Sequence, residues 1–154
     1  MTVLVIDGQG GGLGRQLVAA VKARVPGAAV WAVGPNRAAT TAKLRAGADK
    51  AATGENAVAV ACRRADVIVG PVGIVIADAM LGEITPAMAL AVGQSAAARV
   101  LVPVNQCDNI VAGAQGLPMA RLVQSAAEAV ESLAAGGPGA RAQSGAHLNP
   151  PPRG

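Results

Sequence analysis

The chain has 154 residues and is 52 % hydrophobic, yet it contains one Trp and neither Tyr nor Phe. A chain of this length fits one domain whose core is built from Val, Leu, Ile, Met and Ala. The net charge is +4 without a block of like charges, and aromatic side chains for base stacking are missing. These features argue against a nucleic-acid-binding or membrane-surface protein.

The basic residues are spread along the chain. Of the 13 Lys and Arg, six fall in two segments with helical periodicity, where we expect them on solvated helix faces. These six are Arg15, Lys22, Arg24, Arg37, Lys43 and Arg45.

Cysteine usage and hydropathy indicate a cytoplasmic protein. Cys62 and Cys107 are expected to be reduced, as in most α/β domains. The first residues form a strand pattern without the basic start of a signal peptide. Asp78, Glu83 and Pro86 interrupt the apolar stretch 67–104, so no uncharged run is long enough to span a membrane.

Strand and helix patterns alternate along the chain, and this alternation is the main structural signal. We expect strands at 2–7, 29–33, 49–53, 67–70 and 99–104, and a further strand at 109–112. We expect helices at 13–25, from 37 to about 46, and at 55–63, 74–81, 86–98 and 118–134.

Capping residues support several of these helix boundaries. Asn36 is expected to cap the second helix, and Thr53 or Asn56 the third. Thr85 followed by Pro86 is a typical helix start.

The last part of the chain changes composition. Residues 136–154 are rich in Gly, Pro, Ala and Arg and have little to bury, so we expect a disordered tail. The single histidine, His147, lies in this tail, where nothing would hold it for catalysis. Residues 1–135 therefore form the predicted domain.

Continuous apolar strands that alternate with helices predict an α/β fold. The expected architecture is a three-layer, doubly wound, mostly parallel sheet of the Rossmann-like NAD(P)-binding type. Ligands of such folds bind in the crevice outside the carboxyl ends of the strands.

A glycine-rich turn joins the first strand to the first helix. Its sequence is Asp7-Gly8-Gln9-Gly10-Gly11-Gly12-Leu13-Gly14. The spacing Gly-x-x-x-Gly-x-Gly, at Gly8, Gly12 and Gly14, resembles the turn of short-chain dehydrogenases/reductases. Glycines in this position permit a sharp turn, close approach of a phosphate and close packing of the helix on the sheet. A tight turn without ligand is the alternative interpretation.

Other loops at the same sheet edge extend the candidate site. The second strand ends without the acidic residue that would hold a ribose 2′-hydroxyl, whereas Arg37 could meet a 2′-phosphate, which favours NADP among nicotinamide dinucleotides. The fourth strand ends in a second glycine-bearing loop, and polar residues follow the fifth. The predicted cofactor-binding residues are Gly8, Gln9, Gly10, Gly11, Gly12, Leu13, Gly14, Arg37, Gly70, Pro71, Gly73 and Asn105.

Residues 74–98 are unusually apolar for one small sheet face, so they are also a candidate homo-oligomer interface. Asp78 and Glu83 stand within this apolar region. We expect Glu83 to accept backbone N–H bonds near the helix start at Thr85, with acid–base chemistry as the alternative. Residues 105–109, Asn-Gln-Cys-Asp-Asn, form either part of the site or an ordinary polar turn.

Several segments together resemble one family. Gly-Pro-Val-Gly-Ile-Val-Ile-Ala at 70–77 and Gly-Glu-Ile-Thr-Pro-Ala-Met-Ala at 82–89 are the most specific, and the resemblance covers residues 1–134. They are similar to DUF3842, a family of short Rossmann-like bacterial proteins catalogued as a domain of unknown function. The resemblance implies a small Rossmann-like protein and supplies no catalytic residues.

The sequence leaves the function open among three hypotheses. A nucleotide- or dinucleotide-binding module, such as a sensor or regulatory subunit, uses the glycine turn for a phosphate. An NADP-dependent oxidoreductase would have to borrow catalytic groups from a partner, because short-chain dehydrogenases use a Tyr that this chain lacks. A structural or assembly subunit would leave the turn empty. No cysteine or histidine spacing indicates a metal site.

Overall fold

The computed structural model describes residues 1–104 and 108–136. Five parallel strands form one sheet in the order β3-β2-β1-β4-β5. The strands are β1 (Thr2–Ile6), β2 (Ala29–Gly34), β3 (Lys50–Thr53), β4 (Val67–Pro71) and β5 (Ala98–Val102). The order reverses beside β1, as in a doubly wound fold, which confirms the predicted fold class.

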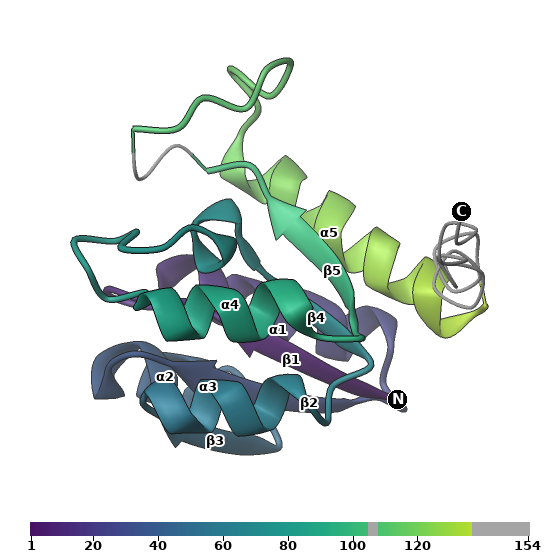
Figure 1. Cartoon of the computed structure of the whole chain (residues 1–154). Helices are drawn as coiled ribbons and strands as arrows, with labels where there is room; N and C mark the ends of the chain where they lie inside the picture. The colour runs from purple at the N-terminus through teal and green to yellow at the C-terminus, as the bar shows by residue number, and fades with distance from the viewer. Residues whose placement is uncertain (105–107, 137–154) are drawn as a thin grey trace, which may run out of the picture.

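Helices cover both faces of the sheet (Figure 1). They are α1 (Gly12–Arg24), α2 (Arg37–Arg45), α3 (Glu55–Cys62), α4 (Pro86–Gln94) and α5 (Met119–Ala134), and a 3₁₀ turn, η1, spans Val72–Val75. Predicted Asn36 and Thr85 caps are confirmed, since their side chains accept the N–H groups of Ala39 and Met88. The third helix is instead preceded by Gly54, which corrects the predicted Thr53 or Asn56 cap.

Alternation along β1 divides the core into two layers. Val3 and Val5 face the layer that α1 and α5 cover, while Leu4 and Ile6 face the layer under α3 and α4. The register places Val3 between Val30 and Val67 in neighbouring strands, so each layer is a continuous aliphatic row across the sheet.

Two predicted elements are wrong. Residues 74–81 do not form a helix: the 3₁₀ turn ends at Val75, and Asp78, Met80 and Leu81 have positive φ angles that a helix excludes. Residues 109–112 do not form a sixth strand. Ile110 is exposed there, and turns at Gly113 and Gly116 have left-handed φ angles.

The apolar segment 74–98 contributes much of the second core layer. Ile74, Met80, Ile84, Met88 and Val92 are all buried. Its composition is therefore explained largely by packing within one chain, and the homo-oligomer interface stays a prediction. No helix among the described residues is long and apolar enough to cross a membrane.

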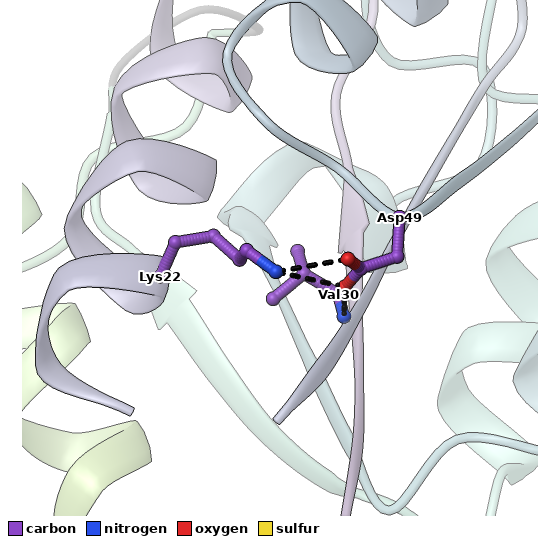
Figure 2. Close-up of polar contacts among 3 residues, drawn as sticks. All are labelled: Lys22, Val30 and Asp49. Carbon is purple, nitrogen blue, oxygen red and sulfur yellow. Dashed lines mark hydrogen bonds and ion pairs between the residues drawn. The ribbon is translucent and has the colours of Figure 1, made fainter. Parts of the chain in front are cut away.

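Asp49, which precedes β3, connects β2 with α1, as Figure 2 shows. Its carboxylate accepts the Val30 N–H at 2.7 Å and the Lys22 ammonium at 2.9 Å. The Val30 N–H, followed by Lys22, lowers the pKa of Asp49 below its usual value. The contact lies near the amino ends of the strands and leaves the carboxyl edge free for a site.

We predict that Gly70→Ala destabilises the fold. A Cβ at this position of β4 would overlap the carbonyl oxygen of Ile6 in β1, so the two central strands would have to separate. Overpacking of this kind costs about 1–3 kcal/mol in the free energy of unfolding. Urea unfolding measures the loss, with Gly93→Ala in α4 as the control, because a Cβ there meets only open space. Equal stability of both variants would contradict the packing argument.

Candidate functional site

The carboxyl edge of the sheet is organised around Asp7, which directly follows β1. Its side chain is buried and turns back toward the first turn of α1. Oδ1 accepts the Gly8 N–H at 2.9 Å, and Oδ2 accepts the Gly14 N–H at 2.7 Å. Burial raises the pKa of Asp7, although the Gly14 N–H and the Lys43 ammonium oppose that shift. An internal carboxylate thus already uses one of the free N–H groups at the start of α1.

Lys43 enters the same region from α2. Its side chain is fully buried, and its ammonium donates to the carbonyl oxygens of Val33 at 2.5 Å and Asp7 at 3.1 Å. The prediction of a solvated Lys43 is therefore wrong. The carbonyl groups at the ends of β1 and β2 need a donor where the parallel ladder stops, and Lys43 supplies it.

The environment disfavours the charged form of Lys43. Burial lowers its pKa to about 8, while the Asp7 carboxylate acts in the opposite direction. Desolvation therefore outweighs the attraction between the two groups.

Two glycines provide the space for this buried pair. A Cβ at Gly14 would lie 2.7 Å from both Asp7 Cβ and Lys43 Cδ. A Cβ at Gly34 would lie 2.5 Å from the Asp7 carbonyl oxygen and 3.2 Å from Lys43 Nζ. The last glycine of the Gly-x-x-x-Gly-x-Gly pattern therefore serves close packing of α1 on the sheet.

Glu83 covers the first part of the glycine turn. Its Oε2 accepts the Gln9 N–H at 2.6 Å, and its Oε1 accepts the Asn36 side-chain amide at 2.8 Å. The same amide donates to the Gln9 carbonyl oxygen at 2.9 Å, so the turns after β1 and β2 are joined. This corrects the prediction that Glu83 binds near the helix start at Thr85, whose hydroxyl donates to Glu55 instead.

The covered part of the turn begins at Gly8. A Cβ on Gly8 would lie 2.6 Å from Glu83 Oε2, 2.7 Å from Met80 Sδ and 3.3 Å from Pro35 Cγ. Asp78, the other carboxylate of the apolar segment 74–98, is exposed.

The second part of the turn is open. Gly10 and Gly12 have no atom within 4 Å of an added Cβ, and neither has a positive φ angle. Within residues 1–104 and 108–136, no partner accepts the N–H groups of Gly10, Gly12 and Leu13. Gly11 differs, because its φ of 71° and its contact with the Ala39 backbone both require glycine.

The remaining predicted site residues differ in their exposure. Arg37 is the exposed first residue of α2, and Arg15 is exposed in the first turn of α1. Gly70, Pro71 and Gly73 are buried where β4 passes into η1, and Gly70 has a packing role of its own. Asn105 and Cys107 lie outside the described residues, as does the predicted tail from residue 137 onward.

Sequence reasoning missed Lys43 and the partner of Glu83. Lys43 does follow Ala39 by four residues and Thr40 by three, and both of these are buried on the inner side of α2. That spacing indicates that Lys43 lies on the buried side of α2, and the glycines at 14 and 34 leave space for its side chain. No local signal connects Glu83 with Gln9, which lies 74 positions earlier in the chain.

The other reactive groups are less suited to chemistry. Cys62 is buried in α3, and burial raises the pKa of its thiol to about 11. No group of three metal-ligating side chains occurs in the part of the chain that the structure describes.

The chain matches one known protein family over most of its length. The model of DUF3842, described as a domain of unknown function, matches residues 2–135. The chain belongs to this family. The match spans the whole sheet and all five helices, so the glycine turn, Lys43 and Glu83 lie within the family domain.

A search of curated proteins finds no match. Among solved structures, the chain is similar to a dodecameric FMN-dependent UbiX-like decarboxylase from Escherichia coli O157:H7. The identity is 21 %, the match covers 86 % of this chain and 76 % of the other, and the TM-score is 0.45.

The pKa of Lys43 predicts how stability depends on pH. Above about pH 8 the folded protein releases the Lys43 proton, whereas the unfolded chain keeps it up to about 10.5. The unfolded state then binds more protons, so the free energy of unfolding rises with pH, by about 1.4 kcal/mol per unit. Cys62 acts in the opposite direction between pH 9 and about 11, because its pKa is raised.

Urea unfolding of a Cys62→Ala variant between pH 7.5 and 10.5 isolates the contribution of Lys43. A Cys62→Ala/Lys43→Met variant is the control and should lose the rise, because it lacks the buried ammonium. A flat or falling profile in Cys62→Ala, or a rise that the control keeps, would show that the ammonium is not held at a desolvation cost.

Proposed function

We propose that this protein is a binding module for a phosphate-bearing small molecule, a nucleotide or dinucleotide, whose phosphate lies against residues 10–13. The observation that carries the proposal is that Gly10 and Gly12 have neither a packing reason nor a backbone reason to be glycine. Glycine costs backbone entropy on folding, at Gly12 within α1 as at Gly10 before it, and close approach of a ligand to the backbone is the usual compensation.

The local electrostatics support an anion at this place. The N–H groups of residues 10, 12 and 13, which have no acceptor among the described residues, lie at the positive end of the α1 dipole. The exposed Arg15 and Arg37 add positive charge at the first turns of α1 and α2. Lys43 compensates the buried charge of Asp7, which would otherwise oppose a phosphate.

The place in the fold supports the same proposal. The opening lies at the carboxyl end of β1, whose neighbours β2 and β4 lead the sheet in opposite directions. Open α/β sheets bind ligands at such a topological switch point. The module could serve as a sensor or regulatory subunit, and its location in the cytoplasm and a homo-oligomeric state belong to the proposal.

A ligand panel tests this proposal. We expect one of NAD, NADP, ATP, coenzyme A or FMN to raise the melting temperature by several degrees, and S-adenosylmethionine, which carries no phosphate, to leave it unchanged. A ligand at 100 times its Kd stabilises the folded state by about 2.7 kcal/mol. Gly12→Val should abolish the shift without unfolding the protein, because its side chain would enter only the open space.

Two variants complete the panel. Gly27→Val should respond like the original chain, since Gly27 is equally unhindered but precedes β2 at the opposite edge of the sheet. Arg37→Ala should weaken NADP while leaving NAD unchanged if the ligand carries a 2′-phosphate. A folded protein that responds to no member of the panel would contradict the proposal and favour the assembly role.

A further inference from the structure

The Glu83 carboxylate occupies a small anion pocket that is built from two turns. Gln9 contributes a backbone N–H at 2.6 Å and Asn36 contributes a side-chain amide at 2.8 Å. Charge-assisted bonds of this length are typical of a carboxylate or phosphate oxygen between converging donors. The pocket continues directly into residues 10–13, where further N–H groups have no acceptor among the described residues.

Asn36 is held in place independently of Glu83. Its Oδ1 accepts the Ala39 N–H at 2.8 Å as the cap of α2, and its amide also donates to the Gln9 carbonyl oxygen at 2.9 Å. Without Glu83, the Asn36 amide would therefore keep its orientation. The Asn36 side of the pocket is therefore preorganised by the cap of α2.

Glu83 itself is brought to the pocket by a strained segment. Asp78, Met80 and Leu81 all have φ angles near +60°, a conformation that such side chains rarely adopt. Leu81 is fully exposed and Glu83 is only half-buried, so the Glu83 side chain can turn outward without opening the core.

Gly8 shows what lies beneath the carboxylate. A Cβ at this position would meet Glu83 Oε2 at 2.6 Å and Met80 Sδ at 2.7 Å, so departure of the carboxylate uncovers one side of Gly8 while Met80 still covers the other.

From these observations we propose that Glu83 is an internal anion that occupies part of the phosphate site, and that an incoming phosphate group displaces it. Gln9 N–H and the Asn36 amide then donate to the ligand, which makes Asn36 a specificity-determining residue. The proposal rests on the proposed function, because it assigns additional donors and a built-in competitor to the same site. It also explains how a site with a carboxylate beside it can accept a phosphate: the ligand replaces a like charge rather than adding to it.

The test uses the full chain, inorganic pyrophosphate as the probe, and ¹⁵N NMR. Pyrophosphate should shift the Gln9 backbone amide and the Asn36 side-chain amide together with Gly10 and Gly12. Glu83→Gln keeps the side-chain shape but removes the charge, and we expect it to bind pyrophosphate roughly tenfold more tightly. Asp78→Asn removes the same charge from the same segment, and we expect no more than a twofold change, because the Asp78 side chain is exposed and is not among the described side chains that bond to the turn.

The outcomes separate the two proposals. Tighter binding by Glu83→Gln, together with shifts at Gln9 and Asn36, supports displacement. Equal or weaker binding by Glu83→Gln, or shifts confined to residues 10–13, overturns displacement while the proposed phosphate site stands. If pyrophosphate binds neither the original chain nor Glu83→Gln, both displacement and the phosphate site are overturned. Backbone spectra of the free variants show whether each has kept the fold.

Discussion

The buried ammonium of Lys43 is the interaction on which the carboxyl edge of the sheet depends. It donates to the carbonyl groups of Asp7, directly after β1, and of Val33, near the end of β2, and it lies close enough to the Asp7 carboxylate to influence its pKa. Asp7 in turn binds the first turn of α1 through Gly14. The helices α1 and α2, the strand β2 and the residue that follows β1 are thus connected around one side chain. The absence of a Cβ at positions 14 and 34 is a consequence of that arrangement.

The arrangement is costly to form. Burial pushes both Asp7 and Lys43 toward their neutral forms, so the pair does not gain free energy simply by being charged. The pair instead determines the local structure, because Asp7 holds the turn after β1 against the start of α1. A preorganised turn is what a phosphate site requires, since donors that are already oriented need no rearrangement when the ligand arrives.

The glycine turn is consequently divided into two parts with different roles. Gly8 lies under Met80 and Glu83, whereas Gly10 and Gly12 face open space. A glycine motif read from sequence treats these positions alike. The structure shows that some glycines accommodate the protein's own side chains, whereas others face open space, and the proposed function places the phosphate at these open positions.

Much of the fold could be predicted from the sequence, because the signals are local. The apolar strands and the caps at Asn36 and Thr85 placed most elements within a few residues of their observed bounds. Residues 74–81 misled the prediction because their apolar spacing is helical, whereas the backbone takes left-handed turns to bury Met80 and Ile84. The burial of Lys43 and the reach of Glu83 to Gln9 are tertiary contacts between distant segments. Periodicity carries no information about them.

The stability of Lys43→Met at pH 7 tests the central claim most directly. Methionine has a similar shape, so the substitution mainly removes the ammonium that serves the ends of β1 and β2 and faces Asp7. We expect urea unfolding to show a loss of about 3 kcal/mol, because a buried carboxylate and two carbonyl groups lose their partner. Lys22→Met, at a partly exposed ion pair, should cost less than about 1 kcal/mol. If Lys43→Met were as stable as Lys22→Met, the carboxyl edge would not depend on Lys43 and the account would be wrong.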